Sequence, residues 1–269
     1  MTKTAPPMIL NQLADVLLDL FFPPRCQVCR AFADDPLCET CRSNALFIEQ
    51  DSCVYCGVPL PVGVPGPLCA NCRRGRQVSG ARAVGLHTGA LREAVIRYKF
   101  HGRRSLAAPL AQMLADVVAR EAQTCGLPLA ECAAMIPVPL HHTRLRWRGF
   151  NQAQLLCEEL AQEADIPVWP DVLVRHRQTD PQVHLSGDTR RANVRGAFEV
   201  RNSPRLRNRS VLLVDDVFTT GATVEECALV LRRAGAAAVY ALTITRALPV
   251  WTIAATFEVE PSAEELAGG

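Results

Sequence analysis

The spacing of apolar residues changes twice along the chain and divides it into three zones. Residues 8–22 carry apolar side chains at roughly helical spacing, which predicts a short amphipathic N-terminal helix that Pro23 and Pro24 end. Residues 25–75 are rich in Cys, Pro and Gly and lack apolar periodicity. They cannot bury a core of their own, so they need a cross-link such as a bound metal ion to fold. Over residues 80–250, short apolar runs alternate with helical segments, a pattern that predicts an α/β domain built on a parallel sheet.

Within the third zone the pattern predicts individual elements. Strands are expected at 83–87, 135–138, 172–174, 211–214 and 237–245. Helices are expected at 91–99, 106–121 and 151–164, and a fourth should open at a capping box of Thr223 and Glu226 and end at Gly235. No apolar period spans residues 178–195, which predicts a long mobile loop, and the acidic residues 258–269 predict a flexible tail.

Composition narrows the class of protein. Of the 269 residues, 49% are hydrophobic and 21% are charged, which is typical of soluble globular proteins and excludes wholesale disorder. The net charge of +2 is too small to indicate nucleic-acid binding by the chain as a whole. The sequence shows neither an apolar run of membrane-spanning length nor a signal peptide, so we expect a cytoplasmic protein without membrane insertion.

Eight of the twelve cysteines form four C-x-x-C pairs in the second zone: Cys26/Cys29, Cys38/Cys41, Cys53/Cys56 and Cys69/Cys72. Two such pairs can hold one tetrahedral Zn²⁺ with no open coordination position, so we predict two structural zinc sites. The first C-x-x-C pair can share a zinc ion with the second (sequential pairing) or with the third (interleaved pairing). Both arrangements supply four cysteines to each ion. A redox role would suit one pair, but four pairs in a Pro- and Gly-rich stretch favour zinc.

The strongest chemical signal is a buried apolar run followed by two carboxylates, Asp215 and Asp216, and a short loop. The loop consists of Val217, Phe218, Thr219, Thr220, Gly221, Ala222 and Thr223. Open α/β sheets bind ligands at the carboxyl ends of their strands, and loop amides followed by a helix N-terminus form an anion site. The carboxylates suit a sugar diol or a Mg²⁺ ion. We therefore predict a ribose 5-phosphate site; a phospho-receiver metal site and an acidic helix cap without a ligand are the alternatives.

This loop resembles the phosphoribosyl-pyrophosphate (PRPP) motif of type I phosphoribosyltransferases. Together with the eight-cysteine segment and the run Arg148-Gly149-Phe150-Asn151-Gln152, it makes nearly the whole chain similar to the ComF/GntX family of DNA-uptake proteins. The resemblance implies a double zinc ribbon followed by a phosphoribosyltransferase-like sheet with helices on both faces. It also implies that Asp215 and Asp216 bind the ribose hydroxyls with Mg²⁺, and that residues 217–223 bind the 5-phosphate.

Basic residues flank this motif. The resemblance makes Arg144 and Arg148 candidates for the pyrophosphate group, together with Arg190 and Arg191 in a hood over PRPP. The mixture of arginine and aromatic residues at Arg146, Trp147, Arg148 and Phe150 also suits single-stranded DNA, unless both rings turn into the core. Residues His87, His101, His176 and His184 have no partner at metal spacing, and we assign them no catalytic role.

Two functions compete at this stage. One is Mg²⁺-dependent transfer of phosphoribose from PRPP to a nitrogen acceptor, with the arginines stabilising the departing pyrophosphate. The other is binding without catalysis, either of single-stranded DNA or of PRPP as a sensor. The resemblance favours a PRPP-binding protein that acts in DNA uptake and natural transformation, with DNA-uptake or helicase proteins as partners.

Overall fold

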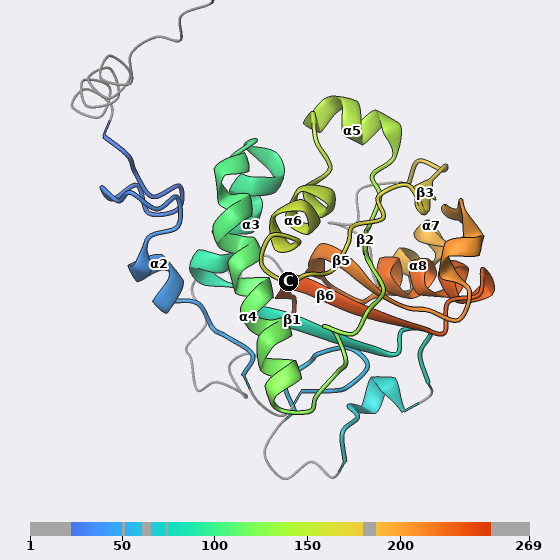
Figure 1. Ribbon diagram of the computed structural model, residues 1–269. Helices are drawn as coiled ribbons and strands as arrows, with labels where there is room; N and C mark the ends of the chain where they lie inside the picture. Colours follow the sequence, from blue (N-terminus) through green and yellow to red (C-terminus); the bar gives the residue numbers. More distant parts are fainter. Residues whose placement is uncertain (1–22, 50–51, 61–65, 74, 180–186, 249–269) are drawn as a thin grey trace, which may run out of the picture.

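A computed structural model describes residues 23–49, 52–60, 66–73, 75–179 and 187–248 (Figure 1). The predicted N-terminal helix at 8–22 and the predicted tail at 258–269 lie outside these residues. At the centre is a parallel sheet of four strands in the order β1-β6-β5-β2. Its strands are β1 (Gly80–Leu86), β2 (Met135–Pro137), β5 (Ser210–Phe218) and β6 (Ala238–Arg246). The predicted parallel α/β architecture is confirmed.

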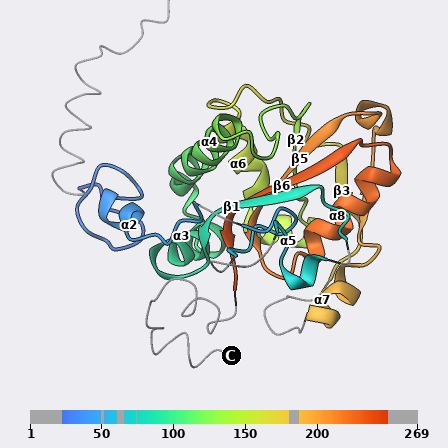
Figure 2. The same ribbon diagram turned by 90° about the horizontal axis from the view of Figure 1, so that it is seen from below.

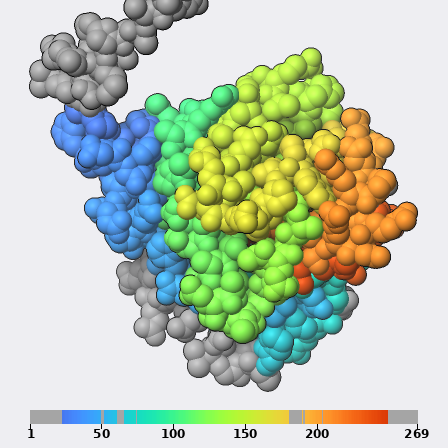
Figure 3. Space-filling model, viewed as in Figure 1, coloured from blue at the N-terminus to red at the C-terminus, as the bar shows by residue number. Residues whose placement is uncertain are grey.

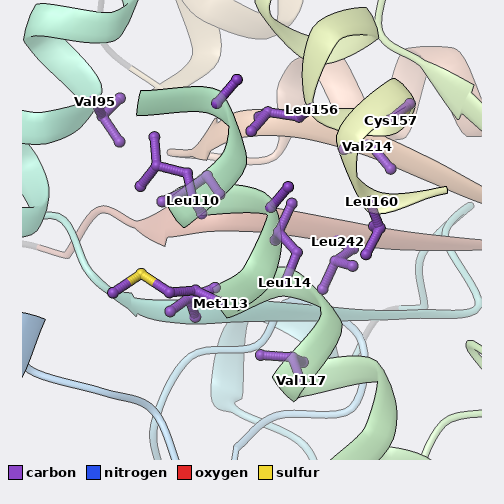
Figure 4. Packing of buried hydrophobic residues seen from close by; sticks show 14 of the residues in the cluster. Val95, Leu110, Met113, Leu114, Val117, Leu156, Cys157, Leu160, Val214 and Leu242 are labelled. Carbon is purple, nitrogen blue, oxygen red and sulfur yellow. The ribbon is translucent and has the colours of Figure 1, made fainter. Parts of the chain in front are cut away.

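Helices cover both faces of this sheet (Figure 2). On one face lie α3 (Gly89–Phe100), α4 (Ala107–Gln123) and α6 (Gln152–Leu160), whose apolar residues pack on β5 and β6. On the other face lies α8 (Ala222–Arg233), with α7 (Gly187–Val194) beside it. Figure 4 shows the first of these cores, where Leu114 of α4 and Leu160 of α6 meet Leu242 of β6. Each such buried side chain contributes about 1.5–3 kcal/mol to folding.

Smaller elements complete the fold. Strands β3 (Leu173–Arg175) and β4 (Phe198–Val200) form an antiparallel pair. The remaining helical elements are α2 (Glu39–Ser43), α5 (His142–Arg148) and the 3-10 turns Ala70–Cys72, Arg104–Leu106 and Ser203–Leu206. The short helix α5 was not predicted. It begins at His141, whose ring accepts a hydrogen bond from the amide of Thr143, and ends at Gly149 in the left-handed conformation.

Two predictions of local structure are wrong. Within the predicted loop 178–195 the chain forms α7, a helix without an apolar period, whose end is stabilised by tertiary contacts. Val194 is buried in the core of the α8 face, and the amide of Gly196 donates to Oε1 of Glu226 at 2.6 Å. Glu226 therefore does not complete a capping box with Thr223, and α8 begins at Ala222, with Gly221 as its N-cap at φ +81°.

The cysteine-rich segment forms two lobes that lie in different parts of the molecule (Figure 3). The first lobe (residues 23–49) contains α2 and packs beside α3. The second lobe (residues 52–60, 66–73 and 75) shares its buried cysteines with the core formed by β5 and α8. Among the helices of the described ranges, none combines the length and the apolar character needed to cross a membrane.

Candidate functional site

Strand β5 carries the two aspartates to opposite faces of the sheet. The strand is longer than predicted, because its register with β6 continues from Asp215, opposite Thr243, to Phe218, opposite Arg246. Side chains alternate between faces along a strand. Asp216 consequently shares the face of α3, α4 and α6, and Asp215 shares the face of α8. The carboxylates lie within the strand rather than after it.

Asp216 is held as an anion. Its side chain is buried, and Nζ of Lys99 at the end of α3 lies 2.7 Å from its Oδ1 atom. Burial alone would raise the pKa of Asp216, but the charges of Lys99 and Arg148 outweigh burial and hold the pKa below its usual value. The side chain of Gln152 also approaches the carboxylate and helps to lower its pKa, but the second oxygen, Oδ2, is buried and has no hydrogen bond of normal geometry from the described part of the chain. A buried, unpaired carboxylate oxygen fits a Mg²⁺ ion or a sugar hydroxyl.

Asp215 differs from its neighbour in its ionisation. Burial, followed by the negative charge of Asp216, raises the pKa of Asp215 to about 7, although Lys99 and Arg175 act in the opposite direction. Its Oδ1 atom accepts a hydrogen bond from the amide of Asp216 at 2.9 Å. At neutral pH this carboxyl group is near its midpoint, so a bound cation would favour its ionised form.

The loop after β5 presents unpaired backbone amides. Gly221 has φ +81°, and a Cβ atom there would come within 2.7 Å of the Phe218 ring, so only glycine fits. Within the described residues, the amides of Thr219, Thr220 and Gly221 donate no hydrogen bond to the protein. Gly221, the N-cap of α8, carries no side chain that could cap the helix, and the amide of Ala222 donates a 3.4 Å hydrogen bond to the hydroxyl of Thr220. Unpaired amides at a helix N-terminus form an anion site.

Three arginines bring positive charge from other elements. Arg144 and Arg148 project from α5, and Arg175 ends β3. Arg144 donates to the carbonyl of Thr179 at 2.9 Å, and Arg175 donates to the hydroxyl of the same residue. The Nε groups of Arg148 and Arg175 are buried and donate to no acceptor in the described ranges. Such unused donors favour an anionic ligand.

The two aspartates, the three arginines and, apart from Thr220, the residues of the loop line one cleft of about 480 Å³ at the carboxyl ends of the strands. Of the residues singled out in the sequence, the cleft is lined by Asp215, Asp216, Val217, Phe218, Thr219, Gly221, Ala222, Thr223, Arg144, Arg148 and Trp147. Arg191 is exposed on α7 and does not line the cleft, and the side chain of Arg190 lies outside the described part. The predicted anion site and the predicted acidic pair are therefore neighbours in one cleft.

Four further polar residues line the cleft without having been assigned a role in it from the sequence: Lys99, Arg175, Gln152 and His87. Lys99 is one of only two lysines in the sequence, which is the sole signal that could have singled it out. His87 donates or accepts a 2.8 Å hydrogen bond with Thr245. Burial, followed by the charges of Arg92 and Lys99, lowers the pKa of His87 to about 4, so its ring is neutral at pH 7.

The aromatic residues of the arginine-rich segment lie in different environments. Trp147 is 72% exposed, and Arg146 beside it is also exposed. Phe150, by contrast, is buried, with its ring 5.6 Å from that of Tyr98 and the guanidinium of Arg104 over it. Phe150 is thus unavailable for stacking on a nucleic-acid base, and its assignment to a DNA surface is wrong.

The eight paired cysteines form two sequential groups. Cys26, Cys29, Cys38 and Cys41 make one group, and Cys53, Cys56, Cys69 and Cys72 make the other, with all four sulfurs of a group within 4.8 Å of one another. Zn–S bonds of about 2.3 Å place tetrahedral ligands about 3.8 Å apart. The observed sulfur separations of 3.8 Å, 3.6 Å and 3.8 Å fit that geometry. Both groups suit a closed structural zinc site.

Comparison with known proteins agrees with this division of the chain. Residues 17–75 match the double zinc ribbon domain, and residues 151–248 match the phosphoribosyl transferase domain. The chain is 35% identical to competence protein F of Haemophilus influenzae over 80% of its own length and 93% of that protein. It is 34% identical to the DNA utilization protein YhgH of Salmonella typhi over 85% of its length and all of that protein.

A more distant relative is competence protein ComFC of Bacillus subtilis, which is 26% identical over 79% of this chain and 85% of that protein. The matches extend across both the cysteine-rich segment and the sheet domain. The chain belongs to the ComF family and joins a double zinc ribbon to a phosphoribosyl transferase domain.

Proposed function

We propose that the cleft binds PRPP together with Mg²⁺. The observation that carries this proposal is the placement of residues 219–221, whose amides donate no hydrogen bond within the described chain, beside a carboxylate pair in which the buried Oδ2 atom of Asp216 has no hydrogen-bond partner among the described residues. The amides would hold the 5-phosphate, and Asp215 and Asp216 would hold the ribose hydroxyls and the metal. Arg144 and Arg148 would hold the pyrophosphate.

The same groups suit phosphoribosyl transfer. Cleavage of the bond between ribose and pyrophosphate builds negative charge on the leaving group and positive charge on the sugar ring. Arg144 and Arg148 would stabilise the first charge, and the carboxylates would stabilise the second. Mg²⁺, when bound, would neutralise the pyrophosphate. Binding of PRPP without turnover, as a sensor, is the second candidate function.

Calorimetric titration with Mg²⁺ and PRPP tests the binding proposal. We expect saturable binding by the natural protein and none by the variant that combines Asp215→Asn and Asp216→Asn, with zinc content and circular dichroism unchanged. Equal PRPP affinity in both proteins would show that the two aspartates do not bind PRPP. Release of pyrophosphate in the presence of a panel of bases then separates a transferase from a sensor, because only a transferase consumes PRPP.

We further propose that the protein acts in DNA uptake and natural transformation, in the cytoplasm, together with DNA-uptake or helicase proteins. Support comes from two relatives, which are named a competence protein and a DNA utilization protein. The exposed pair Arg146 and Trp147 offers a charge and a stacking ring for single-stranded DNA, and Phe100 at 48% exposure lies at the same cleft.

Fluorescence anisotropy with a labelled single-stranded oligonucleotide tests the DNA surface. The variant that combines Arg146→Ala and Trp147→Ala should lose about tenfold in affinity, since stacking contributes roughly 1–3 kcal/mol per base. Arg205→Ala, which removes an exposed arginine from another part of the surface, serves as the matched control. The same affinity and salt dependence in both variants would exclude the α5 surface.

We also propose that the protein binds two structural zinc ions. The sulfur geometry supports one structural zinc in each cysteine group, and reduced cytoplasmic conditions keep the thiolates available. Elemental analysis of purified protein should find about two zinc ions per chain. A value near zero would contradict the proposal.

A further inference from the structure

One buried guanidinium joins the second lobe to the phosphate loop. Arg246, the last residue of β6, is only 9% exposed. Its Nε donates to the carbonyl of Cys56 at 2.9 Å, and its Nη1 donates to the carbonyl of Phe218 at 3.0 Å. The same Nη1 also contacts the carbonyls of Thr219 and Ala247. A zinc-ligand segment and the first loop residues are thereby fixed to the same planar group.

These contacts set the direction in which the loop amides point. A trans peptide plane directs its N–H away from its C=O. Because Arg246 binds the carbonyls of Phe218 and Thr219, the amides of Thr219 and Thr220 point away from Arg246. Both amides are unpaired within the described chain. The guanidinium also lies 4.6 Å from the Phe218 ring centre, and that ring packs directly beneath Gly221.

A second connection reaches the start of α8. Glu225, in the first turn of this helix, accepts a 2.7 Å hydrogen bond from the amide of Gln77 and lies 3.8 Å from the guanidinium of Arg76. Arg76 in turn donates to Sγ of Cys72 at 3.3 Å. The second lobe thus supports the loop from its β5 side and from its α8 side.

The first lobe has no such connection. Its contacts with the sheet domain run to α3, α4 and β1, for example from Arg120 to the carbonyl of Ile48 and from Phe47 to Gly85. Within the described ranges, no hydrogen bond or ion pair joins residues 23–49 to residues 217–225. The two cysteine groups are alike in their ligands but differ in what they support.

We propose that the second cysteine group (Cys53, Cys56, Cys69, Cys72) supports the phosphate loop structurally, with Arg246 as the positioning residue that transmits its geometry to the loop amides. The inference rests on the proposed binding of PRPP by that loop. Loss of zinc from the second group should therefore loosen residues 217–224, and loss of zinc from the first group should leave them unchanged. Phosphate binding should therefore depend on zinc in the second lobe and not on zinc in the first lobe.

Hydrogen–deuterium exchange of the hydrogen-bonded amides in residues 217–224, such as that of Ala222, tests the positioning role without any ligand. The amides of Thr219, Thr220 and Gly221 donate no hydrogen bond within the described chain and do not report it. Arg246→Lys keeps the charge but cannot bind the carbonyls of both regions, so exchange in this segment should rise about tenfold or more, as expected for loss of a charge-assisted hydrogen bond. Arg82→Lys is the matched control, because Arg82 is also a strand arginine with a mostly covered side chain (13% exposed) but pairs with Glu121 of α4. Equal exchange in Arg246→Lys and the natural protein, or an equal rise in Arg82→Lys, would overturn the positioning role.

A second comparison uses the zinc groups themselves. Cys53→Ser with Cys56→Ser should leave about one zinc per chain and raise exchange in residues 217–224, whereas Cys26→Ser with Cys29→Ser should leave one zinc and normal exchange there. Should the first of these pairs fail to fold, Glu225→Gln provides a milder test of the same connection. Identical loop exchange in both zinc variants would contradict the proposal.

Titration of the same proteins with Mg²⁺ and PRPP separates this inference from the proposed function. If the natural protein binds PRPP and Arg246→Lys binds it about tenfold more weakly, the result supports both the proposed ligand and the coupling between the second cysteine group and the loop. If the natural protein does not bind PRPP but the loop still loosens in Arg246→Lys, the coupling stands and the proposed ligand is wrong. If binding is normal in Arg246→Lys and the loop is unchanged, the coupling is wrong and the ligand stands.

Discussion

The two walls of the cleft are built in different ways. The acidic wall comes from one continuous segment, in which the last residues of β5 include Asp215 and Asp216 and residues 219–221 lead into α8. Backbone and buried side chains hold it, with Arg246 fixed beneath the loop. The basic wall is assembled from side chains of separate elements, among them Arg144 and Arg148 of α5 and Arg175 of β3.

This difference has a consequence for ligand binding. The acidic wall has its polar groups already placed, so it should select the sugar phosphate with little rearrangement. The basic wall uses long side chains, two of which donate hydrogen bonds to Thr179. Changes in the acidic wall should therefore weaken every ligand that contains ribose 5-phosphate, and changes in the basic wall should weaken only ligands with a pyrophosphate.

The largest effect is expected for Asp216→Ala. This change removes a buried carboxylate and leaves Lys99 without its 2.7 Å partner, so PRPP and ribose 5-phosphate should both bind about a hundredfold more weakly. Calorimetry with each ligand measures the loss. If only PRPP binding fell, the carboxylate would act on the pyrophosphate side and the division between the walls would be wrong.

A smaller and selective loss is expected when Arg144→Ala is combined with Arg148→Ala. Two charge-assisted contacts disappear, so PRPP affinity should fall about thirtyfold while ribose 5-phosphate binds as before. Arg205→Ala controls for the loss of positive charge elsewhere on the surface. Equal losses for both ligands would show that these arginines do not distinguish the pyrophosphate.

The pH dependence of binding reports Asp215. With its pKa near 7, the group is mostly protonated at about pH 6 and mostly ionised at about pH 8, so Mg²⁺–PRPP affinity should rise by up to about tenfold over this range. Asp215→Asn should lack that part of the dependence, and its titration at each pH corrects for the ionisation of PRPP. If the Mg²⁺–PRPP affinity of the variant had the same pH profile as that of the natural protein, Asp215 would not belong to the metal and ribose site.

Stability should show the opposite trend with pH. The folded chain keeps a proton on Asp215 that the unfolded chain loses above about pH 4, so the free energy of unfolding should fall as the pH rises from about 4 to about 7. Denaturant titrations of the natural protein and Asp215→Asn isolate this contribution. A rise in relative stability over that interval would contradict the raised pKa.

The smallest effect on PRPP is expected for Trp147→Ala. The ring lines the cleft but is 72% exposed, so PRPP affinity should change by no more than about twofold, while single-stranded DNA binds more weakly. Competition between PRPP and a labelled oligonucleotide provides the measurement. A large loss of PRPP affinity would place the ring in the sugar-phosphate site.

The sequence predicted the acidic wall in detail because its chemistry is local. An apolar run, two carboxylates and a Gly-Thr loop are adjacent in the chain, and strand geometry brings them to the sheet edge. The basic wall was predicted only in part. Lys99 and Arg175 lie in basic stretches that flank the motif, but the sequence assigns neither residue a role, because both reach the cleft through the packing of α3 and β3.

Local rules also failed where distant contacts decide the structure. The spacing of Thr223 and Glu226 predicts a capping box, but Glu226 instead accepts from Gly196, and Gly221 is the N-cap of the helix. The pairing of the cysteines was open on spacing alone, because sequential and interleaved groups use the same residues. Folding of the two lobes against different parts of the sheet domain resolves it in favour of sequential groups.

A crystal structure of the protein with Mg²⁺ and PRPP tests the central claim most directly. It should place the 5-phosphate on the amides of residues 219–221, the ribose hydroxyls and the metal beside Asp215 and Asp216, and the pyrophosphate toward Arg144 and Arg148. A phosphate bound elsewhere, with the amides still unpaired, would contradict the proposed site.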